Sequence, residues 1–230
     1  MKIALCTPCR SGYVRHEHMS SIIEILRMAG KRGHKIHHYV APGCSILPRV
    51  RNRLVSAALG EGCEWVVFVD DDIGCEAADF FKLIEHGFDV VAAAPAKRHT
   101  RWDEKGAAVA KFGKQIDEIR TCAGRVWQVQ RLATAFMAIR ADVFEKLEPV
   151  TTAFVSEGDP RTHETRTWFW FDLITDDGET RDEGEDYNFC RKWASIGGKC
   201  YLDPDIRLRH YDGNVCHDFC PADMEITEIA

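Results

Sequence analysis

The chain has 230 residues, of which 45% are hydrophobic, and a formal net charge of −6. This length and apolar content are sufficient for one domain with a sizeable buried core. No apolar run approaches the roughly 18 residues of a membrane span, and the first residues read as a strand rather than a signal peptide, so we expect a cytoplasmic protein. The ten cysteines are too few and too scattered for a disulfide scaffold, and reduced thiols are expected.

Strands and helices alternate through the first 95 residues. Short β-branched or apolar runs predict strands, and apolar residues at helical spacing predict helices. This alternation is typical of an α/β domain with helices on both faces of its sheet. The expected strands are 3–6, 35–40, 65–69 and 89–94, and the expected helices are 20–31, 48–59 and 76–86.

Three carboxylates, Asp70, Asp71 and Asp72, follow the most apolar of these strands. They are expected at the carboxyl edge of the sheet, where open α/β folds bind ligands. In an extended backbone Asp70 and Asp72 point to the same side. Neighbouring carboxylates repel each other unless a positive charge lies between them, so the pattern favours Mg²⁺ or Mn²⁺. The alternative is a solvated loop that caps the next helix.

After Pro95 the charge changes sign. Residues 97–131 contain nine Lys or Arg and four Asp or Glu, with Trp102 and Trp127 between them. Such a segment is either a solvated antiparallel excursion or a surface that faces phosphates. A strand at 133–139 and a short helix at 142–147 are expected to follow.

Aromatic and acidic residues dominate the next region. Trp168–Phe171 cannot all face one core from a strand, so some should line a cavity or platform. Residues 172–186 contain eight acids and one arginine, and end at Glu185 and Asp186. A helix is expected at 187–196, then strands at 199–202 and 206–210, the last ending at His210. A carboxylate pair at a helix start is also ordinary capping.

Five segments, in their order along the chain, resemble the motifs of the family 2 glycosyltransferases of the GT-A fold. Residues 68–73 resemble the DxD motif, 184–190 the xED motif, and 203–210 the closing strand with a metal-binding histidine. Residues 48–54 resemble a helix with an Arg-Asn pair, and 133–140 resemble the segment GTGFMLIRR with two glycines replaced by alanine. The resemblance implies a single GT-A-like, Rossmann-like domain, 1–230, whose central mixed, mainly parallel sheet is flanked by helices. Residues 1–95 would bind the nucleotide sugar, and 96–230 the acceptor and the catalytic groups.

The resemblance also implies roles for individual residues. It predicts a metal-dependent, inverting transferase that uses Mn²⁺ or Mg²⁺ and a nucleotide-sugar donor, a UDP-sugar first. Asp72 and His210 would hold the metal, with Asp70 reaching the metal or the ribose. Asp186 would accept the acceptor's proton, and Glu185 would bind the acceptor or shape the site. The residues expected near the nucleotide are Thr7, Pro8, Arg10, Asn52, Arg53, Asp70 and Asp71.

The acceptor and several alternatives stay open at this stage. Similarity to small phage-type members suggests hydroxymethylated pyrimidines in DNA, in which case the protein would act in the host cytoplasm. A protein or saccharide hydroxyl is the other acceptor. A nucleotidyltransferase and a non-catalytic nucleotide-sugar-binding module are further hypotheses. Cys6 and Cys9 have redox-type spacing without the expected helix, and Cys216, His217 and Cys220 match no common zinc-finger spacing.

Overall fold

The computed structural model describes residues 1–96, 113–155, 165–176, 178–213 and 215–223. Its centre is an eight-stranded sheet with the order β2-β1-β3-β8-β5-β13-β7-β6. The strands of this sheet are β1 (Lys2–Cys9), β2 (Lys35–Pro42), β3 (Trp65–Val69), β5 (Val90–Ala92), β6 (Gln115–Thr121), β7 (Gly124–Val129), β8 (Phe136–Arg140) and β13 (Cys200–Leu202).

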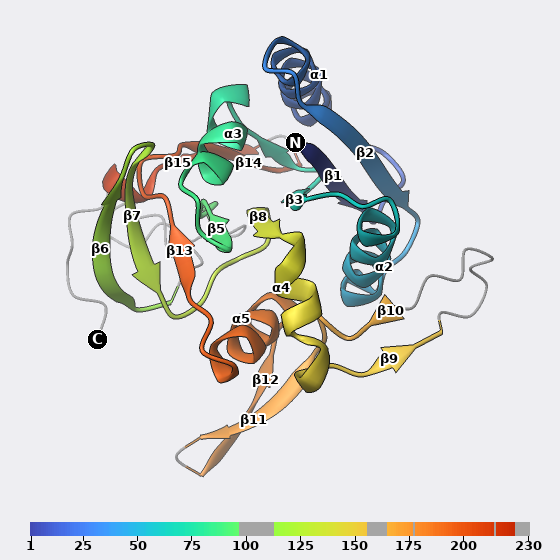
Figure 1. The fold of residues 1–230 in the computed structure, drawn as a ribbon, viewed down its shortest axis with the longest axis vertical. Helices are drawn as coiled ribbons and strands as arrows, with labels where there is room; N and C mark the ends of the chain where they lie inside the picture. Colours follow the sequence, from blue (N-terminus) through green and yellow to red (C-terminus); the bar gives the residue numbers. More distant parts are fainter. Residues whose placement is uncertain (97–112, 156–164, 177, 214, 224–230) are drawn as a thin grey trace.

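Helices cover both faces of the sheet (Figure 1). The helices α1 (His16–Lys31) and α3 (Ala77–Glu85) bury their apolar residues on one face. The helices α2 (Leu47–Gly60), α4 (Ala141–Lys146) and α5 (Glu185–Ser195) pack on the other. Each face has its own core because the strand side chains alternate between them. The α/β fold class is thereby confirmed.

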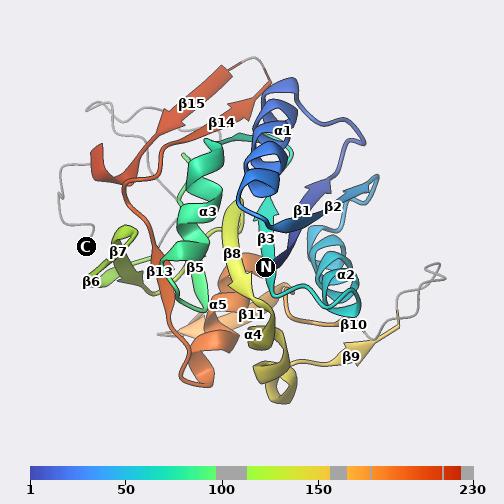
Figure 2. The ribbon, with the colours of Figure 1, turned by 45° about the horizontal axis from the view of Figure 1, so that its top comes forward.

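The sheet is mixed, as expected. Strand β1 is parallel to β2 and β3, and β5 is parallel to β13, while every other neighbouring pair is antiparallel. Antiparallel pairing therefore has a larger share than "mainly parallel" implies. Strand β8 lies between β3 and β5 (Figure 2). Both halves of the chain thus contribute to one sheet, and the division at residue 95 stays a prediction.

The basic segment is only partly described. Residues 97–112 lie outside the described residues, and the rest forms the β6–β7 hairpin, as the antiparallel alternative predicts. Trp127 is not a surface ring there, because it is 6% exposed and its indole N–H donates to Glu118. Trp127 therefore offers no exposed ring on which a nucleic-acid base could stack, and Trp102 lies outside the described residues.

Several short strands were not predicted. Strands β11 (Asp172–Asp176) and β12 (Glu179–Glu183) form a hairpin within the acidic run, which has few of the residues that favour strands. A separate sheet joins two further unpredicted strands, β4 (Ile73–Gly74) and β15 (Val215–Phe219), to β14 (Leu208–Asp212), which corresponds to the strand expected at 206–210. The remaining elements are β9 (Ala153–Phe154) paired with β10 (Thr165–Arg166), and 3₁₀ helices at Glu148–Val150 and Pro221–Asp223.

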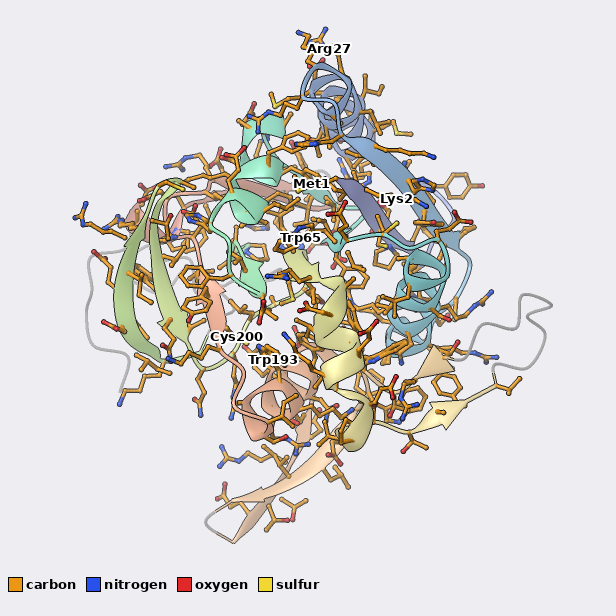
Figure 3. All side chains as sticks on the ribbon, viewed as in Figure 1. Met1, Lys2, Arg27, Trp65, Trp193 and Cys200 are labelled. Atoms are coloured by element: carbon orange, nitrogen blue, oxygen red, sulfur yellow. The ribbon has the colours of Figure 1, made fainter. Side chains whose placement is uncertain are left out.

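The amino and carboxyl ends of the parallel strands lie at opposite edges of the main sheet, and different features lie at each. Lys2, Trp65 and Cys200, labelled in Figure 3, are the first residues of β1, β3 and β13, so that view faces the edge where these parallel strands begin. A pocket of about 690 Å³ lies at this edge, beside Trp193 and Tyr201. The Asp70–Asp72 run lies at the opposite edge. Within the described residues, no helix is both long enough and apolar enough to cross a bilayer.

Candidate functional site

The Asp run forms a turn rather than an extended segment. The N–H of Ile73 donates to the carbonyl of Asp70 (3.0 Å), and Ile73 then enters β4. Side-chain alternation does not apply across such a turn. The alternation from which Asp70 and Asp72 were expected on the same side is therefore absent, and each carboxylate has a different partner.

Asp70 is bound by a buried arginine. The Nη1 and Nη2 atoms of Arg51 donate to Oδ1 and Oδ2 of Asp70 at 3.0 and 3.1 Å, a bidentate pair. Arg51 is 1% exposed, and its guanidinium also lies over the ring of Phe68. Arg51 therefore supplies the positive charge that the sequence attributes to a metal at Asp70. The sequence argument left Arg51 without a role.

The same guanidinium reaches the start of α5. Its Nε atom lies 3.5 Å from Oε1 of Glu185, which is 8% exposed. Burial lowers the pKa of Arg51, but the carboxylates of Asp70, Glu185 and Asp186 outweigh it, and the net shift is upward. A buried guanidinium is tolerated only when carboxylates compensate it in this way.

Asp72 faces His210. The N–H of Tyr211 donates to the carbonyl of Asp72 (3.0 Å), which places β14 beside the turn. His210 Nε2 then lies 3.6 Å from Asp72 Oδ2, and His210 Nδ1 lies 2.5 Å from the carbonyl of Ala96. Such a carbonyl accepts the Nδ1 proton and leaves Nε2 to act as a ligand, the arrangement typical of metal-binding histidines. These two residues fit a divalent cation.

The described residues contain no group of three metal-binding side chains. Asp70 bonds to Arg51 instead of joining Asp72 and His210. Metal binding by Asp70 stays a prediction, and the geometry favours a site with two protein ligands. Cys216 and His217 are consecutive in β15 and so point to opposite faces, which is unsuited to a shared zinc ion.

The residues predicted to face the nucleotide differ in exposure. Pro8 is buried, Arg53 is half-buried and Arg10 is exposed. Thr7 is fully buried, and its hydroxyl lies 3.3 and 3.1 Å from ring nitrogens of His18 and His38. Burial lowers the pKa of both histidines. The nucleotide contacts stay predictions, and among Pro8, Arg53 and Arg10 only Arg10 is exposed.

Asn52 has a clear internal role. Its Nδ2 donates to the carbonyl of Phe169 (2.8 Å), and its Oδ1 accepts the Phe169 N–H (2.9 Å). Asn52 is fully buried. Trp168 and Phe169 are buried too, while Trp170 and Phe171 are 40% and 57% exposed. The aromatic run is therefore divided between the core and the surface, and the lining of a cavity or platform by some of these rings stays a prediction.

Asp186 lies in the first turn of α5. Its Oδ1 accepts the N–H of Tyr187 (2.8 Å), and a Cβ atom on Gly184 would lie only 3.1 Å from that oxygen. A small pocket of about 100 Å³, lined in part by Tyr187 and Arg131, lies next to this turn.

At the end of β1, burial and then a hydrogen bond to Asp71 raise the pKa of Cys9. A cysteine with a raised pKa is a poor nucleophile. Cys6 is fully buried, and burial raises the pKa of its thiol as well. Both cysteines are free thiols. Burial of Cys6 and the raised pKa of both thiols do not favour a redox role for this pair.

No family model matches this chain, and no curated protein matches it by sequence. Among solved structures, it resembles A197 from STIV, with a TM-score of 0.58 and 16% identity over 96% of this chain and 91% of that one. The similarity is one of fold.

Two looser matches accompany it. TarS from S. aureus, solved with UDP-GlcNAc, has a TM-score of 0.48 and 14% identity over 88% of this chain and 56% of that one. A glycosyltransferase involved in the glycosylation of the major capsid of PBCV-1 has a TM-score of 0.35 and 11% identity over 64% and 63%. One of these two structures is thus that of a glycosyltransferase, and the other contains UDP-GlcNAc.

Proposed function

We propose that this protein is a metal-dependent, inverting glycosyltransferase that moves a sugar from a nucleotide-sugar donor to an acceptor hydroxyl. The observation that carries the proposal is the pairing of Asp72 with His210, whose other ring nitrogen is oriented by the carbonyl of Ala96. The pair lies beside Asp70, which shares Arg51 with Glu185, the residue before Asp186. The sequence motifs come together at one edge of the sheet.

The residues have separable roles in such a reaction. A divalent cation held by Asp72 and His210 would stabilise the negative charge that develops on the departing diphosphate. Asp186 takes the proton of the acceptor hydroxyl as its oxygen attacks the anomeric carbon from the face opposite the leaving group. Asp70, whose carboxylate is held by Arg51, would reach the ribose of the donor or the metal.

A panel of nucleotide sugars, UDP-sugars first, tests the proposal. The protein is incubated with each donor and Mn²⁺, together with hydroxymethylcytosine DNA, oligosaccharides or an unfolded protein as acceptor. Release of a nucleoside diphosphate with sugar on the acceptor supports the proposal. Release of pyrophosphate from a nucleoside triphosphate and a sugar phosphate would indicate a nucleotidyltransferase, and donor binding without turnover a binding module.

A further inference from the structure

Arg51 connects three elements that meet only in the folded chain. It projects from α2, its fork binds Asp70 at the end of β3, and its Nε reaches Glu185 at the start of α5. The side chain of Glu185 is 11% exposed and that of Arg51 is 2% exposed. Glu185 thus faces the interior salt bridge rather than an open acceptor surface.

We infer that Arg51 and Glu185 are positioning residues. They tie the first turn of α5 to Asp70 and so hold Asp186 for proton abstraction. This inference rests on the proposed function, since it assigns Asp186 the role of base. It gives Glu185 no contact with the acceptor.

Helix geometry explains how the pair acts on its neighbour. Consecutive residues of an α-helix are separated by about 100° around its axis and 1.5 Å along it. Fixing the carboxylate of Glu185 therefore fixes both the rotation and the height of the turn that carries Asp186. Gly184 precedes this turn, and its lack of a side chain leaves room for the Asp186 carboxylate. A misplacement of about 1 Å is enough to cost a hundredfold in rate.

The charge balance requires both carboxylates. A guanidinium out of water is stable only if its donors are matched with acceptors, and a carboxylate left without its arginine destabilises the site. Arg51 keeps its charge here, because a guanidinium is not deprotonated in proteins. Removing either partner should therefore loosen the same turn, and removing both should add little.

Steady-state kinetics of Arg51→Lys, Glu185→Gln and the double variant test the inference. We expect each single variant to lower kcat about tenfold, with the acceptor KM within about twofold, and the double variant to lower kcat no further than the worse single variant. Arg140→Met is the control, because Arg140 pairs with Asp89 and Asp142 away from the site. A large rise in acceptor KM for Glu185→Gln, or multiplicative effects on kcat, would overturn the inference.

Urea unfolding provides a readout that does not need turnover. The unaltered protein, the two single variants and the double variant form a double-mutant cycle. We expect their unfolding equilibrium constants to be coupled by about fivefold or more. Absence of coupling would overturn the inference. If the unaltered protein transfers no sugar from any donor, the proposed function fails, and the unfolding cycle still decides whether Arg51 and Glu185 act as a unit.

Discussion

Asp72 and His210 present hydrogen-bond acceptors to each other across 3.6 Å when the Nδ1 proton of His210 is donated to Ala96. A cation between them removes the conflict. We expect Asp72→Asn to weaken Mn²⁺ binding by about a hundredfold or more, since loss of an outer partner alone costs 10- to 100-fold. Titration with Mn²⁺, followed by its paramagnetic resonance signal, measures this. Asp89→Asn at the opposite edge is the control, and full turnover in excess EDTA would contradict a metal role.

Asp186 is the general base in the proposed reaction. Asp186→Asn keeps an oxygen that accepts the Tyr187 N–H, so the turn should persist. We expect the transfer rate to fall by at least about a hundredfold, the usual scale for a general base. Donor affinity, measured by calorimetry, should change less than about twofold. Asp182→Asn, on the neighbouring hairpin, is the control, and a parallel loss of donor affinity would reassign Asp186 to binding.

Asp79 makes stability depend on pH. Burial, reinforced by Asp203 and opposed by Lys82, raises the pKa of Asp79 from 3.8 to about 6. Between these values the folded state binds more protons than the unfolded state, so the free energy of unfolding falls as pH rises. Because Asp79 is only half-buried and solvent screens part of the effect, the span corresponds to about 2 kcal/mol.

Asp79→Asn removes that dependence. We expect the variant and the unaltered protein to be equally stable near pH 4, and the variant to be more stable by about 2 kcal/mol at pH 7. Urea unfolding at both pH values measures the gap. Asp203 does not interfere, because the hydrogen bond from His86 and that from Lys82 overcome burial and lower its pKa, and its contribution is lost only below about pH 4. A gap that is the same at both pH values contradicts the assignment.

At the scale of elements, the sequence predicts best where a pattern is local. The strand Trp65–Val69 has the same bounds in the sequence-based prediction and in the structure, because five consecutive apolar residues are typical of a strand buried in the middle of a sheet. Arg51 stands four and seven residues before Val55 and Ala58, so helical spacing alone places it on the buried face of α2. Its charge hid that signal.

Elements that depend on distant partners were missed for a physical reason. The two residues of β4 form a strand only because β14, more than 130 positions later, pairs with them. The β11–β12 hairpin carries acids that Arg191 of α5 partly neutralises through Glu183 and Asp172. Neither stabilising contact leaves a periodic pattern in the sequence.

Asn52 ties α2 to the segment that precedes β11. Asn52→Ala leaves a buried N–H and a buried carbonyl of Phe169 without partners, and each such group costs about 1 to 3 kcal/mol. We therefore expect the free energy of unfolding to fall by about 2 to 5 kcal/mol, measured by urea unfolding at 25 °C. Donor affinity should be unchanged in the fraction that folds. A stable variant with weakened donor binding would restore the nucleotide-contact role predicted from the sequence.

At the scale of the whole molecule, the candidate site assembles from segments far apart in the chain. Residues near positions 51, 70, 96, 185 and 210 meet at one edge of the sheet. The order of the motifs indicated this meeting, but the partner of each carboxylate was not predictable, because spacing says nothing about which side chains face each other. The net charge of −6 is also set by the entire chain rather than by any one segment.

That charge decides how DNA would bind, if DNA carries the acceptor. The acidic β11–β12 hairpin directly precedes Glu185 and Asp186 and repels phosphates, so attraction has to come from the basic residues between 97 and 131. Among the described ones, Arg125 is already bound by Asp205, and Arg131 lies over the ring of Tyr187. The cations that remain for DNA include Lys97, Arg98 and Arg101, outside the described residues.

Filter binding of hydroxymethylcytosine DNA over increasing salt tests this source of attraction. Three phosphate contacts would lower the association constant roughly 40-fold when salt rises from about 50 to 200 mM, because each contact releases a counterion. Charge reversal at Lys97, Arg98 and Arg101 should weaken binding and flatten the salt dependence, whereas reversal at Arg140, away from the site, should change neither. Absence of binding at the lowest salt would remove DNA as an acceptor and leave protein or saccharide hydroxyls.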